Sequence, residues 1–181
     1  MSETNVMEPV TQAEIKQMVK ASTEEVFSTM LDLSLTLIEA QSASEHPMLV
    51  ESGATVVSLI GLTGPWAGTG SITCTGEFAC SLASRFLSTE YEQVNEEVLD
   101  AVGEITNMII GNVKTALEDR VGPMDLSTPA VIFGQIFQTY SARIHDWLVI
   151  RFRCGEQRLQ VQMCLAESKP PQPRMFRFPG T

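Results

Sequence analysis

Hydrophobic positions along this chain recur with two different periods, and the changes of period divide it into helices and strands. Helical spacing of apolar residues covers three stretches, residues 11–32, 77–87 and 95–119. Ser22, with Glu25 three residues later, resembles a capping box, which leaves open that a second helix starts inside the first stretch. Gly122 and Pro123 follow the third stretch and are typical of a helix end.

Short extended segments between the helical stretches predict the strands. They cover residues 33–40, 55–64 and 68–76, a segment within 128–140, and a strong hairpin of 146–154 and 157–167 joined by Gly155–Glu156. Residues 41–47 read as a loop and residues 64–68 as a turn. The order is helix, about three strands, helices, about three strands. It predicts an α+β fold of two similar halves, with an antiparallel sheet and the helices packed on one side.

The helix predicted from Asn95 has two faces of opposite character. Turning each residue by about 100° around the helix axis gathers an apolar stripe of Val98, Val102, Ile105, Ile109, Val113 and Ala116. Nearly opposite lies a set that we call the acidic ridge, formed by Glu97, Asp100, Glu104, Asn107 and Gly111. Met108 and Ile110 are predicted to flank it. Glu104 and Asn107 stand side by side on the ridge, one helical turn apart.

The ridge is either a solvated helix face or a surface built for a partner. A glycine in the middle of a helix costs about 1 kcal/mol relative to alanine, and close approach of another surface at Gly111 would offset that cost. The amide of Asn107 offers a donor and an acceptor at fixed geometry. Such a group can hold a water molecule in line with a phosphorus atom.

The sequence lacks the residues that several other kinds of catalytic or cofactor-binding site require. The segment GTGSIT at 68–73 has neither the third glycine of a dinucleotide loop nor the lysine of a P-loop. His46 and His145 fit neither a zinc pattern nor a catalytic triad. A di-iron site would need a histidine where Asn107 stands. The ridge carboxylates lie on a convex face, with no pocket to perturb them.

Composition narrows the partner and the compartment. The formal net charge of −10 argues against nucleic acid and against an anionic membrane surface. The four cysteines form no CxxC pair and are predicted to be buried free thiols; they are Cys74, Cys80, Cys154 and Cys164. The sequence shows no signal peptide and no apolar run of membrane-spanning length, so a cytoplasmic location is expected. We expect one domain over residues 11–167, between a flexible N-terminus (1–10) and a Pro-rich basic tail (168–181).

Three segments resemble one known family. DAVGEITNMIIGNVK (100–114) is similar to the active-site helix of the CheX-type chemotaxis phosphatases, in the CheC/CheX/FliY family. SLIGLTGPWAGTGSITC (58–74) and LSTPAVIFG (126–134) resemble the hairpin and the strand after the helix in that family. The likeness covers residues 11–166. It implies a CheC-like fold of two pseudo-equivalent halves, each a helix plus three strands.

The resemblance also implies a function. Such proteins hydrolyse the aspartyl-phosphate of a phosphorylated CheY-like response regulator. Asn107 would orient the attacking water, and Glu104 would anchor to a regulator lysine. No cofactor is expected in this chain, because the Mg²⁺ would belong to the regulator. The remaining partner-binding residues would be Glu97, Asp100, Met108 and Gly111.

The family offers a choice between one site and two. CheC-type members carry a second Glu-x-x-Asn on the first helix, whereas here Glu25 is followed three residues later by Ser28. A single site fits CheX better, and CheX-type members imply a homodimer joined through the sheets. The alternative function is a catalytically silent adaptor that binds a regulator or a chemosensory or flagellar component through the same helix face. A purely structural dimer module is a third possibility.

Overall fold

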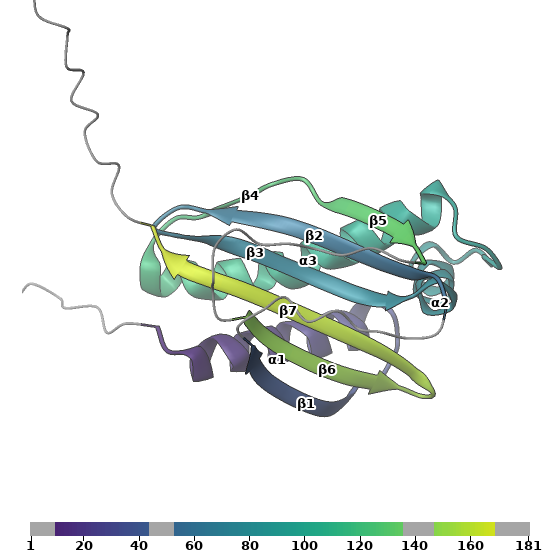
Figure 1. Ribbon diagram of the computed structural model, residues 1–181, viewed down its shortest axis with the longest axis horizontal. Helices are drawn as coiled ribbons and strands as arrows, with labels where there is room; N and C mark the ends of the chain where they lie inside the picture. Colours follow the sequence, from purple (N-terminus) through teal and green to yellow (C-terminus); the bar gives the residue numbers. More distant parts are fainter. Residues whose placement is uncertain (1–9, 44–52, 136–146, 169–181) are drawn as a thin grey trace, which may run out of the picture.

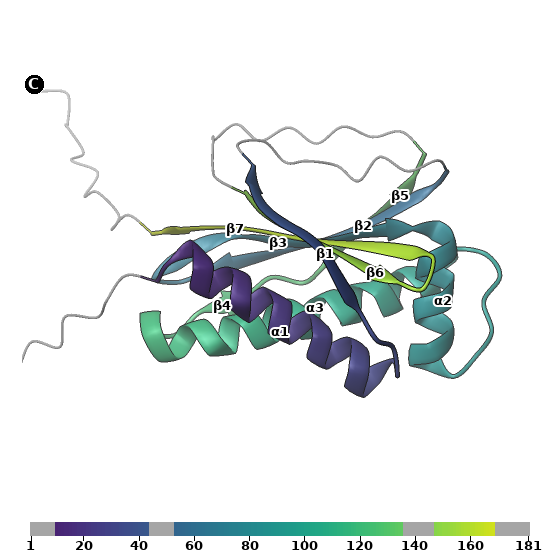
Figure 2. The same ribbon diagram turned by 90° about the horizontal axis from the view of Figure 1, so that it is seen from below.

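The computed structural model describes residues 10–43, 53–135 and 147–168, and in these residues three helices and seven strands form two layers (Figure 1). The helices are α1 (Gln12–Met30), α2 (Gly76–Leu87) and α3 (Glu96–Val121). The strands are β1 (Thr36–Ala43), β2 (Thr55–Thr63), β3 (Trp66–Thr75), β4 (Asp125–Leu126), β5 (Ala130–Gly134), β6 (Trp147–Cys154) and β7 (Gln157–Glu167). Every strand pairing is antiparallel, and the helices lie on one face of the sheet (Figure 2). The predicted α+β class is confirmed.

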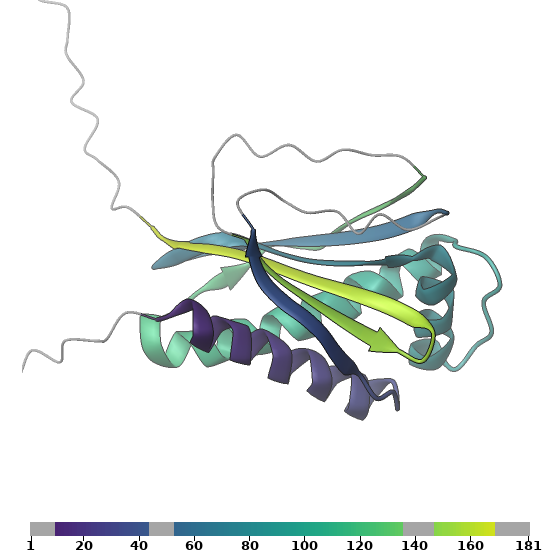
Figure 3. The same cartoon turned by 60° about the horizontal axis from the view of Figure 1, so that its bottom comes forward.

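The strand pairing confirms the two similar halves. The sheet order is β1-β6-β7-β3-β2-β4, and β5 also pairs with β2. Each half contributes one hairpin, β2–β3 or β6–β7, and the two hairpins meet through β3 and β7. The first strand of each half pairs with the second strand of the other, β1 with β6 and β5 with β2. Helix α1 therefore corresponds to α3, and the two pack side by side under the sheet (Figure 3).

The core lies between the helices and the inner face of the sheet. Five members of the predicted apolar stripe of α3 are at most 1% exposed: Val98, Val102, Ile105, Ile109 and Val113. Ala116 is half-buried. Ile110 does not flank the ridge as predicted, because it is fully buried against β3. The four cysteines are buried, as predicted.

The glycines of GTGSIT serve packing. A Cβ on Gly70 would lie 2.6 Å from Cδ1 of Ile110, so the absence of a side chain lets α3 settle onto β3. A Cβ on Gly68 would lie 1.8 Å from the carbonyl oxygen of Cys164 on the neighbouring strand β7. Both positions are strand positions where another element comes close.

The first helix is continuous, so a second start at Ser22 is wrong. Ser22 is buried in the middle of α1. The N-cap is Thr11, whose hydroxyl accepts from the Glu14 N–H at 3.2 Å, while the Glu14 carboxylate accepts from the Thr11 N–H at 2.8 Å. This capping box has the same Ser/Thr-x-x-Glu spacing as the one at Ser22. Spacing alone did not distinguish them.

Several predicted boundaries need small corrections. Val10 was assigned to the flexible N-terminus but packs into the core at 8% exposure. Strand β1 extends to Ala43, so it includes the start of the predicted loop, and β3 begins at Trp66, inside the predicted turn. The rest of both predicted termini, residues 1–9 and 169–181, and residues 136–140 of the predicted strand segment lie outside the described residues.

Glu14 also ties α1 to the far end of α3. Its carboxylate accepts from the Arg120 guanidinium at 2.9 Å. The hydrogen bond from the Thr11 backbone, helped by Arg120 and by the Thr11 hydroxyl, lowers the pKa of Glu14 from 4.5 to about 2. A depressed carboxyl pKa stabilises the folded state above the unfolded-state pKa, and this contribution disappears as the pH falls through the folded-state pKa.

We therefore expect part of the acid destabilisation between pH 4.5 and about 2 to belong to Glu14. Urea unfolding at a series of pH values measures it. Glu14→Gln should flatten the loss of unfolding free energy in that window, because the side chain no longer takes up a proton. Glu25→Gln is the matched control, since Glu25 is exposed on the same helix. Equal acid profiles for wild type and Glu14→Gln would contradict the assignment.

Candidate functional site

The acidic ridge lies on the side of α3 nearly opposite its buried apolar stripe. The helix begins at Asn95, whose side chain accepts from the Val98 N–H at 2.9 Å, and it continues without a break to Val121. Glu97, Asp100 and Glu104 are exposed, while Asn107 and Gly111 are half-buried. The predicted pattern of inward stripe and outward ridge is therefore correct.

Glu104 and Asn107 are both available to a partner. Neither side chain forms a hydrogen bond or an ion pair with the residues that the structure describes. They lie one turn apart on the same exposed face. The carboxylate can pair with a cationic side chain of another molecule, while the neighbouring amide can form a hydrogen bond to a water molecule in the same interface.

The other predicted partner-binding residues differ in their surroundings. The hydroxyl of Tyr91, in the loop before α3, donates to the Glu97 carboxylate at 2.8 Å. This bond is the main cause of a raised pKa of Tyr91, and it ties Glu97 to its own chain. Met108 is half-buried and packs against the core. Asp100 is exposed beside Glu104.

Gly111 is not closely packed within this chain. A Cβ there would have one near neighbour, Cδ1 of Leu126 at 3.8 Å, an ordinary contact. Gly103, one turn before Asn107, is buried and lies against another segment. A Cβ there would lie 3.4 Å from Cγ2 of Val131 and 3.7 Å from Cβ of Pro129, which are ordinary contacts. Sequence reasoning did not single out Gly103, because its neighbours belong to a segment more than twenty residues later.

The equivalent position on α1 does not form a second site. Helix α1 ends at Met30 and α3 at Val121, so Glu25 lies near a helix C-terminus whereas Glu104 lies in the N-terminal half of its helix. Glu25 and Ser28 therefore lie at a different level along their helix from the Glu104–Asn107 pair. The first turns of α1 contain Glu14 and, three residues later, Gln17. Glu14 is already bonded to Thr11 and Arg120.

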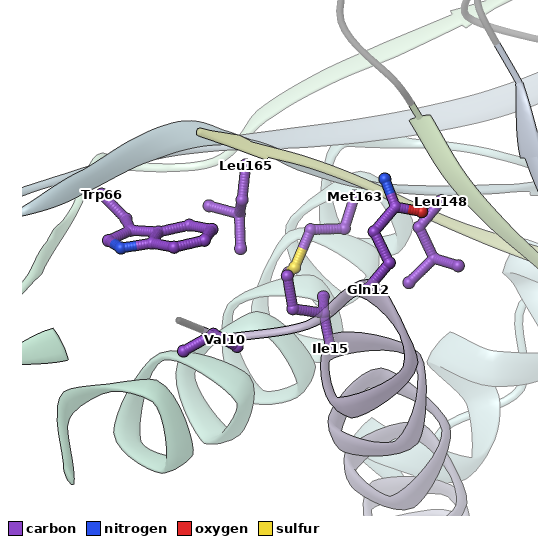
Figure 4. A pocket seen from close by; sticks show the side chains of 7 residues that line it. All are labelled: Val10, Gln12, Ile15, Trp66, Leu148, Met163 and Leu165. Carbon is purple, nitrogen blue, oxygen red and sulfur yellow. The ribbon is translucent and has the colours of Figure 1, made fainter. Parts of the chain in front are cut away.

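The cavities lie elsewhere. A cavity of about 140 Å³ near the start of α1 is lined by apolar side chains and Gln12; the apolar residues are Val10, Ile15, Trp66, Leu148, Met163 and Leu165 (Figure 4). A broader groove runs beside α2, where Tyr91 and Phe133 lie on its walls. Neither includes a ridge residue from Asp100 to Gly111. The ridge residues from Asp100 to Gly111 therefore line neither of these two cavities.

The described residues contain no group of three or more histidine, cysteine, aspartate or glutamate side chains placed to hold a metal ion. None of their helices is long and apolar enough to cross a membrane.

Comparison with known proteins connects the ridge to one family. Residues 56–153, which include the acidic ridge, match the family model described as "Chemotaxis phosphatase CheX". A curated relative, the "CheY-P phosphatase CheX" of Thermotoga maritima, is 31% identical over 87 residues. That alignment covers 48% of this chain and 56% of the relative's own length, so it spans little more than half of that protein.

Solved structures share the whole fold. The chemotaxis protein CheX from Vibrio vulnificus superposes with a TM-score of 0.73 at 27% identity, covering 84% of this chain and 99% of that chain. The CheX of a CheX–CheY–BeF₃–Mg²⁺ complex from Borrelia burgdorferi superposes with a TM-score of 0.66 at 22% identity, covering 83% and 97%. The second likeness supports the fold alone.

Proposed function

The chain belongs to the CheX family of chemotaxis phosphatases, and from that premise we propose that it dephosphorylates a CheY-like response regulator. The observation that carries the proposal is the pair Glu104 and Asn107, adjacent and outward on α3 and without a partner among the described residues. The name of the Thermotoga relative gives phosphorylated CheY as the substrate of that protein, and the Borrelia CheX was crystallised with CheY. We extend this substrate to the present chain.

Asn107 acts on the water molecule in this proposal. Its amide enters the regulator's active site and holds a water in line with the phosphorus of the aspartyl-phosphate. The water oxygen forms a new P–O bond while the bond from phosphorus to the aspartate oxygen breaks. The products are inorganic phosphate, which carries the oxygen and the protons of the water molecule, and a free aspartate carboxylate. A neutral amide suffices because the transition state is loose and positioning supplies most of the catalysis.

Glu104 acts as the anchor. Its carboxylate pairs with a lysine of the regulator. Glu104 lies one helical turn from Asn107, which enters the active site of the regulator. The Mg²⁺ of the reaction is proposed to belong to the regulator. Binding through the anchor sets the position of Asn107, so the two residues have separable effects on affinity and on turnover.

The test is the lifetime of a phosphorylated CheY-like regulator from the same genome, measured with and without the protein. Faster phosphate loss supports the phosphatase. Saturable binding of the regulator without faster loss would favour the silent adaptor, which uses the same ridge. Absence of any binding to every cognate regulator would remove both.

Two features of the family are proposed for this chain as well. One is a homodimer joined through the sheets, which fits the exposed Leu37 and Ile38 on the edge strand β1. The mass of the particle in solution tests it. The other is a cytoplasmic location, where response regulators act.

Gly111 provides a prediction on docking. Because a Cβ there meets only Leu126 at 3.8 Å, Gly111→Ala should stabilise the free protein by about 1 kcal/mol through helix propensity. The same methyl group should weaken regulator binding if the partner comes close at that point. Urea unfolding and regulator titration measure the two effects. A variant that is stabilised and binds as well as wild type would show that the regulator does not approach Gly111.

A further inference from the structure

The segment between β4 and β5 passes along α3. A Cβ on Gly111 would lie 3.8 Å from Cδ1 of Leu126, and a Cβ on Gly103 would lie 3.4 Å from Cγ2 of Val131 and 3.7 Å from Cβ of Pro129. Along the helix the two glycines are about 12 Å apart at 1.5 Å per residue. From Leu126 to Pro129 an extended chain covers about 10 Å. The segment therefore passes along one side of α3 from the level of Gly111 to the level of Gly103, and Asn107 lies midway between the two glycines along the helix. Asn107 is half-buried, while Glu104 is exposed.

This corner contains one residue more than the strand it faces. Leu126 pairs with Leu62, and Ala130 pairs with Leu59. Between these pairs β2 has two residues, 60–61, and the corner has three, 127–129. An extra residue of this kind forms a bulge, which leaves one residue without ladder bonds and often re-aims a side chain near a site.

The corner is held in place at Ser127. Its N–H donates to the carbonyl of Gly61, and its hydroxyl accepts from the Gly61 N–H, each at 2.9 Å. The same hydroxyl donates to the carbonyl of Thr128 at 2.9 Å. Thr128 itself is exposed, and its N–H and hydroxyl bond to no other described residue. An anchored backbone thus presents two donors without a described partner on the segment that passes along α3.

The side chains of the acidic ridge include only one hydrogen-bond donor. The ridge carboxylates accept hydrogen bonds and repel anions, and the amide of Asn107 is the one ridge side chain that can donate. A phosphorylated receiver domain presents acceptor oxygens around its phosphorylation site, on the phosphoryl group and on backbone carbonyls. Hydrogen-bond donors on the segment that passes along α3 therefore complement this partner.

We infer that the Ser127–Pro129 corner is a second wall of the regulator-binding surface, and that the Thr128 hydroxyl donates to an acceptor oxygen at the rim of the regulator's phosphorylation site. The inference rests on the proposed function, because it takes the phosphorylated regulator as the occupant. It makes Thr128 a positioning residue: it fixes the regulator against Asn107.

The test compares Thr128→Val, which keeps the shape but removes the hydroxyl, with Thr128→Ser, which keeps the hydroxyl. Thr128→Val should raise KM for the phosphorylated regulator about tenfold, the loss of one hydrogen bond, with kcat within about twofold. Thr128→Ser should restore wild-type KM. Titration of the BeF₃-bound regulator gives a second readout that needs no turnover. Thr29→Val, an exposed threonine on α1, is the control and should change neither.

The outcomes separate the two proposals. If wild type neither binds the regulator nor speeds its dephosphorylation, the proposed function fails and the corner loses its occupant. If wild type is active and Thr128→Val matches it in KM and in affinity, the function stands and the second wall is overturned. Equal weakening by the valine and serine variants would overturn the role of the hydroxyl.

Discussion

Asn107→Ala should lower the rate of regulator dephosphorylation at saturation by about a hundredfold or more, because a water no longer held in line with the phosphorus loses most of the positional advantage. Regulator affinity should change little, since the anchor remains. The variant should also fold normally. Asn107 is half-buried on the outer face of α3 and forms no hydrogen bond with the described residues, so its loss leaves no buried polar group unpaired.

Phosphate loss from the regulator, followed over a range of protein concentrations, separates the saturated rate from the half-saturating concentration. Gln17→Ala is a matched control, because it removes an exposed amide from the counterpart helix α1. It should leave both parameters at wild-type values. A saturated rate for Asn107→Ala equal to that of wild type would refute the water-positioning role, because dephosphorylation would then not depend on the Asn107 amide.

The sequence predicted local features well, because helical and strand periods follow from the chain itself. The stripe and the ridge of α3 come from a period of 3.6 residues, and the amide at Asn107 stands out against that period. Ile110 was misplaced because the buried arc is wider than the stripe. The buried arc also includes Ile110, whose side chain occupies the space beside Gly70 of β3. The period of α3 alone gives no information about a glycine on a neighbouring strand.

Features that depend on contacts between distant segments could not be predicted. The corner at Ser127 is defined by its bonds to Gly61, and the sequence carries no sign of that pairing. Glu25 was compared with Glu104 from the sequence, and the helix boundaries place Glu25 near the C-terminus of α1 but Glu104 in the N-terminal half of α3. The capping spacing noted at Ser22 is also present at Thr11, and the fold places the N-cap at Thr11 and buries Ser22 inside α1.

These contacts explain why a common four-residue pattern can form a specific site. Glu-x-x-Asn on an exposed helix is chemically unremarkable in isolation, and the carboxylate alone would attract many cations. On α3 the pair has an acidic neighbour, Asp100, one turn from Glu104, and the segment after β4 passes along the same helix. In the proposed complex, specificity for one regulator would come from shape and hydrogen-bond donors around Asn107, and affinity would come from charge.

Glu104→Ala should act on affinity rather than on the saturated rate. Removing one partner of a charge pair that is desolvated in a complex costs about 2–5 kcal/mol, which raises Kd about thirtyfold or more. Much of this cost is the regulator lysine left without a counter-charge. Glu104 is exposed in the free protein and has no partner among the described residues, so the free protein should keep its stability.

Titration of the regulator against Glu104→Ala at two salt concentrations measures this effect. Asp119→Asn is the control for net charge: it removes a charge from an exposed position on α3 outside the ridge and should weaken binding only through screened, long-range attraction. An unchanged Kd for Glu104→Ala would refute the anchor. A change that disappears at high salt, as in the control, would reduce Glu104 to general steering. A large loss of affinity that persists at high salt, with the saturated rate retained, would assign regulator binding to Glu104. Together with the effect of Asn107→Ala, it would place binding and catalysis on two residues one helical turn apart.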